Sequence, residues 1–313
     1  MEKIAYLGPC GTYSEEVAQR LFGNRQDVEL VAYQSIDRAI RAVEQDDALF
    51  AVVPIENSLG GSVTITLDIL AHDASLYIVS EATLAIEHAL FLPEGTVTEI
   101  VSHEQALAQC RHYIEENYPN VLMRPVKSTA HAVELAAEKG STIGAIGSVR
   151  AGEVFGLVPV ATAINDTANN STRFVVLAKD HIQPQGTNVK TSIVCQINGQ
   201  KPGSLYDLLY EFKKHDVNLT RIESRPARTA LGEYIFFFDL EGTPREDNIR
   251  EAFDAIQKNS SWFKHLGSYT VEQICYNKKK KSYIRLRALL YCADAQMRLS
   301  NHIITYPYKP FMM

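Results

Sequence analysis

The chain has 313 residues, 46% of them apolar and 22% charged, which is an ordinary composition for a soluble protein of two or three domains. Its formal net charge is −6, although residues 276–313 carry eight Lys or Arg residues against one Asp. The rest of the chain is therefore acidic, which argues against nucleic-acid binding. An anionic ligand would need a local cation to overcome this negative charge.

Membrane, metal and dinucleotide sites are not indicated by the sequence. No apolar run approaches the roughly 20 residues that span a bilayer, and the first residues lack the pattern of a secretory signal. The five cysteines and nine histidines are scattered, without the spacing of a disulfide framework or a metal site. No GxGxxG motif follows a predicted strand. We expect a cytoplasmic protein without metal and without contact to membranes or nucleic acid.

Strands and helices alternate from the first residues onward. Residues 3–7, 29–33 and 49–54 are predicted strands, and the last is apolar throughout, as in a sheet covered on both faces. Helices are expected after Thr12 and after Ser35, because each of these capping residues precedes apolar residues at helical spacing. This order predicts a first α/β unit.

A second α/β unit follows, and then a linker rich in Pro, Gly, Asn and Gln. Its predicted elements are an extended segment 76–92, strands 99–102, 121–126, 143–147, 158–163 and 173–178, and helices from 103 and over 129–139. Two such units predict a cleft between two lobes, since open α/β sheets bind ligands beyond the carboxyl ends of their strands. Polar loops lie at four such ends: 8–14, 54–63, 102–105 and 166–173.

Residues 190–271 have a different order of elements. Strands are predicted over 190–198, 217–225, 233–241 and 263–271, and helices over 203–215 and 244–258. The order is βαββαβ, a ferredoxin-like plait, and it indicates a separate α+β module. One of its strands carries the unbroken aromatic run Phe236-Phe237-Phe238.

A hydroxyl and a cation are adjacent at the end of the polar stretch DTANNST, where Thr172 and Arg173 enter a predicted buried strand. Adjacent side chains on a strand point to opposite faces, but at an irregular junction both can reach one cleft. Threonine can donate a hydrogen bond to a leaving oxygen, and arginine can bind a carboxylate with its planar fork. A plain strand start with an exposed arginine is the alternative.

The other polar loops offer further candidates, each with a purely structural alternative. Gly11 and Thr12 begin a helix whose free N–H groups could bind an anion. Asn57 and Ser58 precede two glycines that would allow a ligand close approach, or that simply form a turn. Ser102 is predicted to cap a helix, with Gln105 at its third position.

Five stretches follow one another in the order of a known family: YLGPCGTYSEEVA, VVPIENSLGGSV, SHEQALAQC, NNSTRFVVL and PGSLYDLLYEFKKHDVNLTRIESRP. Together they resemble the prephenate dehydratase family, and the last is similar to that family's regulatory ACT domain. The resemblance implies a two-lobed catalytic domain like type II periplasmic binding proteins, followed by the ferredoxin-like ACT domain. It covers residues 1–180 (lobe one about 1–75 and 160–180, lobe two about 76–159), a linker 181–189 and an ACT domain 190–272, and leaves an atypical basic tail 273–313.

The family converts prephenate to phenylpyruvate, water and carbon dioxide in phenylalanine biosynthesis, and uses no cofactor. Its Thr-Arg-Phe motif corresponds to Thr172, Arg173 and Phe174. We expect Thr172 to assist the leaving hydroxyl and Arg173 to bind a substrate carboxylate. The remaining expected substrate contacts are Phe174, Gly11, Thr12, Asn57, Ser58, Ser102 and Gln105.

The ACT domain implies feedback inhibition by L-phenylalanine in a homodimer or homotetramer. The expected effector site combines two sets of residues from neighbouring subunits: Gly203, Ser204 and Leu205 from one, and Asn218, Leu219, Glu223 and Ser224 from the other. Two alternatives remain at this level. One is an arogenate dehydratase, which acts on the amino analogue of prephenate, and the other is a non-catalytic amino-acid sensor of the same fold.

Overall fold

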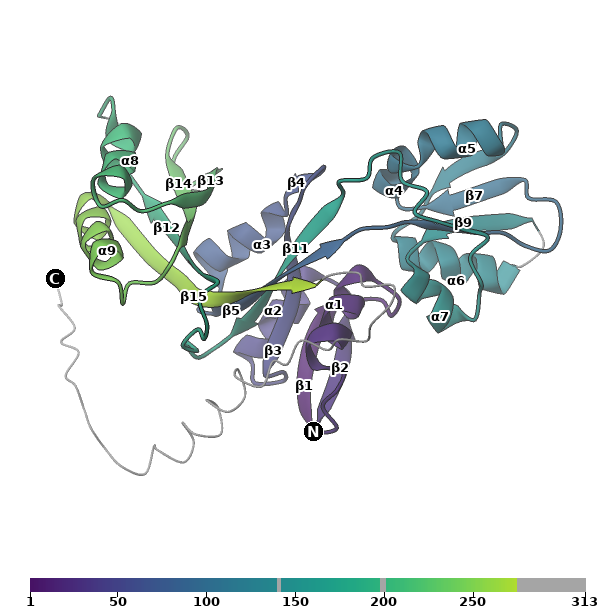
Figure 1. Ribbon diagram of the computed structural model, residues 1–313, viewed down its shortest axis with the longest axis horizontal. Helices are drawn as coiled ribbons and strands as arrows, with labels where there is room; N and C mark the ends of the chain where they lie inside the picture. The colour runs from purple at the N-terminus through teal and green to yellow at the C-terminus, as the bar shows by residue number, and fades with distance from the viewer. Residues whose placement is uncertain (140–141, 198–200, 275–313) are drawn as a thin grey trace.

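A computed structural model describes residues 1–139, 142–197 and 201–274. The molecule is elongated, with a first lobe in the centre, a second lobe at one end and a C-terminal module at the other (Figure 1). The predicted basic tail lies outside the described residues from 275 onward. Within the described part, no helix has the length and apolar character that crossing a bilayer requires.

The first lobe is built on a mixed sheet that contains the three strands predicted near the N-terminus. Its elements are β1 (Glu2–Leu7), α1 (Tyr13–Phe22), β2 (Val28–Tyr33), α2 (Ile36–Glu44), β3 (Phe50–Asn57), β4 (Gly61–Ser62), α3 (Thr64–Asp68), a π-helical turn (Ile69–Asp73), β5 (Tyr77–Ala85) and β11 (Ser171–Ala178). Thr12 and Ser35 cap α1 and α2 through their side-chain oxygens, as predicted. The strand order β5-β11-β3-β1-β2 leaves β11 in the interior of the sheet.

The second lobe has its own sheet, in the order β10-β6-β9-β7-β8. Its elements are β6 (Ala89–Phe91), β7 (Glu99–Ser102), α4 (Glu104–Gln109), α5 (Arg111–Asn117), β8 (Leu122–Pro125), α6 (Thr129–Lys139), β9 (Ile143–Gly147), α7 (Val149–Phe155) and β10 (Ala161–Thr162). The two α/β lobes are confirmed. The extended segment 76–92 is divided, because β5 pairs with β11 in the first sheet and only β6 belongs to the second.

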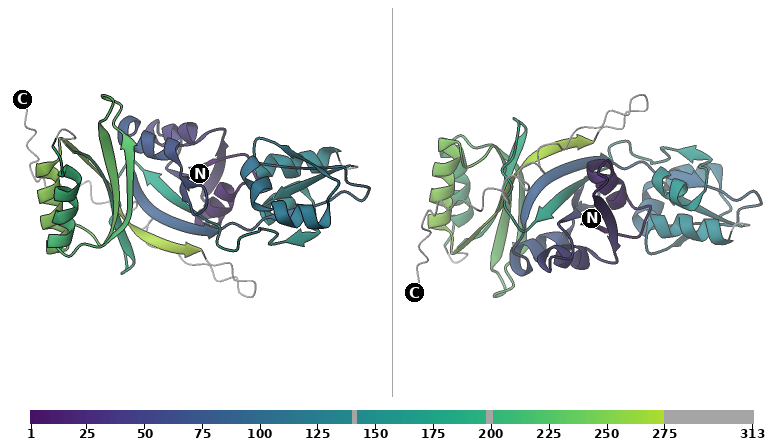
Figure 2. Two further views of the ribbon diagram at one scale, coloured as in Figure 1. Left: turned by 90° about the horizontal axis from the view of Figure 1, so that it is seen from above. Right: turned by 90° about the horizontal axis from the view of Figure 1, so that it is seen from below.

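The C-terminal module has the predicted βαββαβ order. Its elements are β12 (Val189–Gln196), α8 (Ser204–Lys214), β13 (Leu219–Pro226), β14 (Tyr234–Glu241), α9 (Asp247–Asn259) and β15 (Trp262–Ile274). The strand order is β13-β14-β12-β15, and β15 continues in parallel beside β5, so module and first lobe share one sheet. The helices α8 and α9 cover the face that is turned away from the first lobe (Figure 2).

Alternation along the strands explains why the module is apolar on both faces of its sheet. Phe238 packs in a core beneath α8 and α9, whereas Phe237 packs in a core shared with the first lobe. Ile193 and Val194 divide in the same way. The aromatic run in β14 is thus the pattern of a strand covered from both sides. The module therefore packs on the first lobe over a hydrophobic surface.

Candidate functional site in the cleft between the lobes

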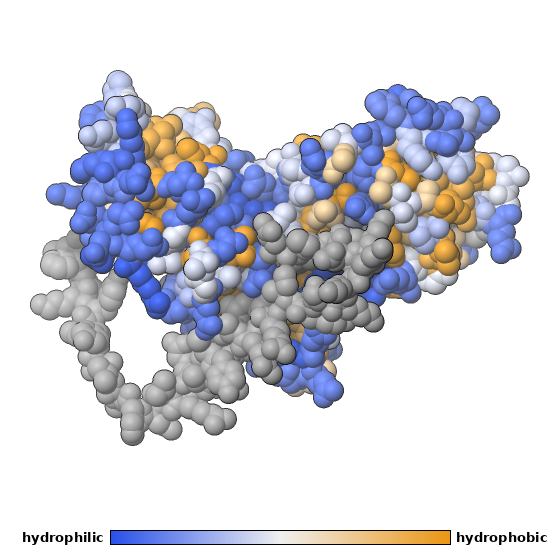
Figure 3. Space-filling model, viewed as in Figure 1, coloured by the Kyte–Doolittle hydropathy of each residue, from blue (hydrophilic) through white to orange (hydrophobic). Residues whose placement is uncertain are grey.

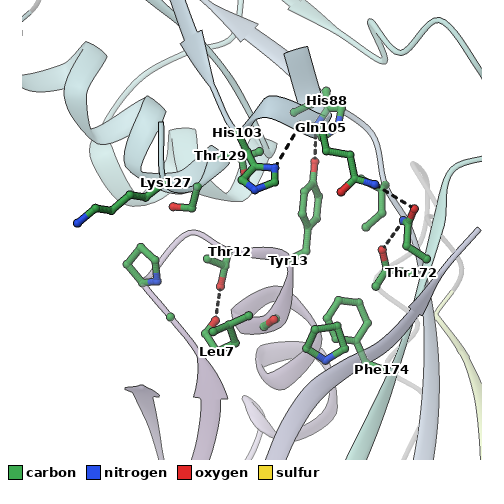
Figure 4. Close-up of a pocket in the computed structure, with 18 of the residues that line it drawn as sticks. Leu7, Thr12, Tyr13, His88, His103, Gln105, Lys127, Thr129, Thr172 and Phe174 are labelled. Carbon is green, nitrogen blue, oxygen red and sulfur yellow. Dashed lines mark hydrogen bonds between the residues drawn. The ribbon is translucent and has the colours of Figure 1, made fainter. Parts of the chain in front are cut away.

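A cavity of about 940 Å³ opens between the first and second lobes, beyond the carboxyl ends of β1 and β3 (Figure 4). Among the predicted site residues, it is lined by Thr12, Asn57, Gln105, Thr172 and Phe174. The second lobe contributes the start of α4 and the residues Lys127–Thr129 before and at the start of α6. The volume is that of a site for a small molecule.

Thr172 is held by an amide whose orientation the backbone fixes. The side-chain oxygen of Asn57 accepts hydrogen bonds from the N–H groups of Leu59 (3.0 Å) and Gly60 (2.7 Å). The amide nitrogen must therefore face the other way, where it donates to Oγ1 of Thr172 over 2.9 Å. Because Oγ1 is the acceptor here, the hydroxyl proton of Thr172 is left to donate toward the cavity.

Donor and acceptor roles also determine the orientation of the side chains that follow Asn57 in this hydrogen-bond network. Its amide nitrogen also donates to Oδ1 of Asn170 over 2.9 Å, so the nitrogen of Asn170 faces Gln109 and donates to its Oε1 over 2.9 Å. That oxygen lies 3.0 Å from Nε2 of His88, which must therefore carry a proton. A chain of hydrogen bonds thus joins β3, the 163–170 connection, α4 and the segment after β5.

His88 is the far end of this chain and is almost completely buried. Burial lowers its pKa, so the imidazole is neutral and its Nδ1 is an acceptor. The hydroxyl of Tyr13 lies 2.9 Å from Nδ1 and 2.9 Å from the carbonyl oxygen of Glu87. Figure 4 shows Tyr13 and His88 meeting across the cleft. The pair joins α1 of the first lobe to the strand that leads into the second.

Arg173 is not among the residues that line the cavity, whereas the sequence led us to expect it in one site with Thr172. Thr172 and Phe174 both line the cavity, so the side chain between them projects from the opposite face of β11. There the guanidinium forms ion pairs with Glu56, Glu81 and Asp239. Side chains therefore alternate along β11 through the junction, although its pairing register with β3 shifts between Arg173 and Phe174.

Three other predicted contacts also lie outside the cavity lining. The N–H of Gly11 donates to the carboxylate of Glu15. Ser58 is exposed, and its hydroxyl donates to the carbonyl of Asn169 over 2.8 Å. Ser102 is buried and donates to the carbonyl of Ile146 over 2.6 Å inside the second lobe. These groups are satisfied within the protein and stabilise the loops around the site.

The predicted cap of α4 is also displaced by one residue. The helix begins at Glu104, and the capping residue is His103, whose Nδ1 accepts from the N–H of Gln105 over 3.3 Å. Gln105 thereby turns toward the cleft, and its amide nitrogen lies 3.5 Å from Oδ1 of Asn57. This contact joins the second lobe directly to the residue that holds Thr172.

Several residues of the site were not predicted from the sequence, among them Tyr13, His88, Gln109, Lys127 and Asn170. Gln109 lies four residues after Gln105 on α4, a spacing that places both on one helical face. Glu87 and His88 interrupt the apolar segment 84–92, which is a signal of polar groups with fixed partners. Among the described residues that line the cavity, Lys127 is the one lysine or arginine. The other basic residues of the lining are histidines.

The residues predicted to bind an effector lie in two groups within the module. Gly203 adopts the left-handed conformation immediately before α8, and Leu205 packs against the module core. Asn218 and Leu219 follow α8, whose 11 residues are about 16 Å long. Ser204 belongs to the first group. Glu223 and Ser224 lie further along the exposed edge strand β13.

Comparisons with known proteins indicate mainly one family. A family model described as prephenate dehydratase matches residues 4–182. The prephenate dehydratase of Methanocaldococcus jannaschii is 37% identical over 272 residues, covering 86% of this chain and 98% of the relative. The structure of prephenate dehydratase from Arthrobacter aurescens in complex with L-Phe is 30% identical and superposes with a TM-score of 0.79, covering 96% of this chain and 98% of that one. A structure described as GqqA, a novel type of quorum quenching acylase, is 28% identical with a TM-score of 0.77, covering 87% of this chain and 98% of that one.

Proposed function

This chain belongs to the prephenate dehydratase family, and we infer from that membership that it is a hydro-lyase of L-phenylalanine biosynthesis. It converts prephenate to phenylpyruvate, carbon dioxide and water. We place the reaction in the cleft because the hydroxyl of Thr172 is oriented there. Asn57 donates a hydrogen bond to its Oγ1 over 2.9 Å. The residue roles below are proposals built on that contact.

Thr172 acts as the hydrogen-bond donor to the leaving hydroxyl. Prephenate loses carbon dioxide from one end of its ring and hydroxide from the other, and the ring becomes aromatic. Since the electrons of the breaking C–C bond enter the ring, the enzyme mainly needs to stabilise the departing oxygen. A donor whose proton is already aimed into the cavity does this without reorganisation. As the C–O bond breaks, the departing hydroxide keeps this hydrogen bond and takes the proton that completes water from solvent, so Thr172 remains a neutral hydroxyl.

The dianion is bound at the far end of the cleft from Thr172. In prephenate, the hydroxyl is attached opposite the ring carbon that carries both the leaving carboxylate and the pyruvyl side chain. Lys127 and Thr129 lie on the second-lobe side of the cavity, away from Thr172 (Figure 4). The side chain of Lys127 is exposed and can reorient toward a ligand.

The start of α6 adds N–H donors to this end. Ser128 precedes the helix and accepts from the N–H of His131 over 3.1 Å, which leaves the earlier N–H groups of the first turn to face a carboxylate. These N–H groups and Lys127 hold the pyruvyl carboxylate, and the ring carboxylate remains loosely held so that it can leave as neutral carbon dioxide. Phe174 and Ala106 supply apolar surface for the ring.

The C-terminal module is an ACT domain that binds L-phenylalanine between two copies of the chain. Gly203 and Asn218 lie before and after α8, so one copy cannot bring both groups to one small ligand. Two copies could do so by pairing along β13, which is an edge of the sheet. Figure 3 shows apolar residues gathered over this part of the module, and Ile222 of β13 is 49% exposed. The L-Phe complex of the Arthrobacter aurescens relative supports this proposal.

The ACT domain occupies residues 190–272 and the catalytic domain residues 1–180, and the assembly is a homodimer or homotetramer. Isothermal titration with L-phenylalanine tests the effector site, and sedimentation with and without the ligand tests whether binding requires two copies. Absence of heat at millimolar ligand would contradict the regulatory assignment.

Turnover of prephenate by the pure protein, followed through phenylpyruvate absorbance at alkaline pH, tests the proposed function. Arogenate, the amino analogue of prephenate, is the comparison substrate, and a preference for it would make the chain an arogenate dehydratase.

Thr172→Val removes the hydroxyl at nearly constant volume, and we expect kcat to fall by about 10² or more. Thr172→Ser retains the donor and should keep most of the activity. Equal kcat for the valine variant and the wild type would contradict the donor role.

A further inference from the structure

The guanidinium of Arg173 joins the catalytic strand β11 to the C-terminal module. Its Nη2 lies 2.6 Å from the carboxylate of Asp239 on β14 and 3.5 Å from the hydroxyl of Tyr269 on β15. On the first-lobe side, its Nε lies 2.8 Å from Glu81 and its Nη1 3.1 Å from Glu56. Nη1 and Nη2 therefore donate hydrogen bonds to Glu56 and Asp239, whereas Nε is close to Glu81 as an ion pair without a hydrogen bond.

The guanidinium of Arg173 is buried and is kept charged by the carboxylates around it. The Arg173 side chain is only 11% exposed. Burial alone would lower its pKa, but the carboxylate of Asp239 and its neighbours raise it above the ordinary arginine value. Asp239 is itself fixed, because Ser192 donates to its second oxygen over 2.5 Å. Lys190 pairs with the other oxygen of Glu81 over 2.8 Å, so charges of both signs are matched across the boundary.

Two adjacent residue pairs between β3 and β11 face different parts of the molecule, one the cleft and the other the C-terminal module. Thr172 pairs with Asn57, and this pair forms the cleft contact described above. Arg173 pairs with Glu56, and this pair faces the module. The two pairs share one stretch of backbone, so a shift of Arg173 or Glu56 moves Thr172 or Asn57 with it.

A second arginine of the module reaches the same place. Arg221 on β13 is buried, and its Nε lies 3.5 Å from the carboxylate of Glu56. Its Nη2 donates to Oγ of Ser62 on β4 over 2.7 Å. The turn between β3 and β4 contains Gly60, whose N–H helps to orient Asn57. The module thus contacts both strands that flank this turn.

We propose that Arg173 and Arg221 are positioning residues, through which the docked C-terminal module sets the geometry of Thr172 and Asn57. The inference rests on the proposed function, since it concerns the same reaction. It assigns the arginine of the Thr-Arg-Phe motif to the boundary between module and first lobe, in place of a substrate contact. It also gives β13, the strand proposed to face the effector, a direct contact with these residue pairs between β3 and β11.

The test changes the module side of the contact and measures catalysis in the cleft. Asp239→Asn keeps the shape of the side chain and removes its charge, and Asp239 does not line the cavity. We expect kcat to fall about tenfold or more, because a displacement below 1 Å of a catalytic group can have such an effect. The KM for prephenate should stay within about twofold, since no substrate contact is lost.

Asp68→Asn is the matched control. Asp68 pairs with Arg225 and Arg228 of the module, 2.9 and 3.0 Å away, and these contacts do not involve β3 or β11. This variant loosens the same boundary at another point, and we expect kcat near that of the wild type. If Asp239→Asn and Asp68→Asn lowered kcat equally, the effect would be general loosening of the module and the positioning role would be refuted.

A double-mutant cycle separates positioning through Thr172 from an independent effect. In the Thr172→Val background, Asp239→Asn should cause little further loss of kcat, because the group that it positions is already gone. Full additivity would overturn the inference. Tyr269→Phe removes one oxygen beside Arg173 and should also lower kcat, by a smaller factor than Asp239→Asn. This second variant provides the test if Asp239→Asn does not fold.

The wild-type chain is assayed first. If it failed to turn over prephenate, both the proposed function and this inference would fall. If it turned over prephenate and the Asp239→Asn variant matched its kcat, the inference alone would fall. A rise in KM for Arg173→Lys, with kcat unchanged, would restore Arg173 as a substrate ligand.

Discussion

Thr172 and Arg173 are consecutive in the chain, and their side chains leave β11 on opposite faces. One lines the cleft, and the other is buried against Asp239 of the C-terminal module. The Thr-Arg-Phe motif therefore contributes side chains both to the cleft and to the boundary with the C-terminal module. Loss of either residue would lower activity, but for different physical reasons: loss of the donor in one case and loss of its position in the other. Kinetic parameters separate the two where a simple activity assay would not.

Asn57→Asp should abolish most turnover although the side chain keeps its shape. The carboxylate has no N–H, so it would accept the proton of Thr172 and draw it away from the cavity. It would also face Oδ1 of Asn170 and the carbonyl of Ser171, two acceptors that now receive hydrogen bonds from Asn57. We expect kcat to fall by about 10² or more, in steady-state assays of phenylpyruvate formation.

Ser58→Ala is the control for this prediction. Ser58 is the next residue, but its hydroxyl bonds to Asn169 and Ser171 outside the cavity lining. We expect a stability loss of about 1 kcal/mol and a kcat close to that of the wild type. An Asn57→Asp variant as active as Ser58→Ala would show that the amide does not control Thr172.

Lys127→Met should weaken substrate binding and leave the chemical step almost intact. Removing a charged hydrogen-bond donor to a carboxylate is expected to raise the KM for prephenate by about tenfold. Since the side chain is exposed, added salt should raise the KM of the wild type more than that of the variant. Lys139→Met, at the opposite end of α6, is the matched control. Equal KM values for the two variants would exclude Lys127 from the site.

Local patterns predicted the elements of this fold, and contacts between distant segments decided the site. Capping by Thr12 and Ser35 was readable because it depends on neighbouring residues. The placement of Arg173 was not, because its partners on β14 and β15 lie 66 and 96 residues away in the chain. A polar loop ahead of β11 suggested that both side chains could reach one cleft, whereas the side chains alternate along β11 and the irregularity lies in its pairing with β3, between Arg173 and Phe174.

The aromatic run of β14 shows a similar limit. Three consecutive phenylalanines indicated a buried strand, but they could not indicate that one face packs on α8 and α9 while the other packs on the first lobe. The linker suggested an independent module, since a separate βαββαβ unit needs only its own core. The second apolar face of the sheet is the physical reason why the module packs against its neighbour.

His265→Phe should reduce the loss of stability in mild acid. Burial, together with the nearby His181, lowers the pKa of His265 to about 4. Between pH 7 and pH 5, the unfolded chain therefore takes up a proton at this position that the folded chain does not, and stability falls as pH falls. From the difference between about 4 and the ordinary 6.5, this residue accounts for roughly 2 kcal/mol of the loss over that interval.

Phenylalanine keeps the ring that packs edge-on against Phe253 and removes the titrating group. Ser268, which lies 3.3 Å from the imidazole, retains Thr191 as a partner at 2.8 Å. Urea unfolding at pH 5 and pH 7 should therefore show a difference about 2 kcal/mol smaller for the variant than for the wild type. Between pH 7.5 and 8.5 the two proteins should show the same slope, because His265 is neutral in both states there. Parallel curves from pH 7 to pH 5 would mean that the imidazole is accessible to water in the folded protein.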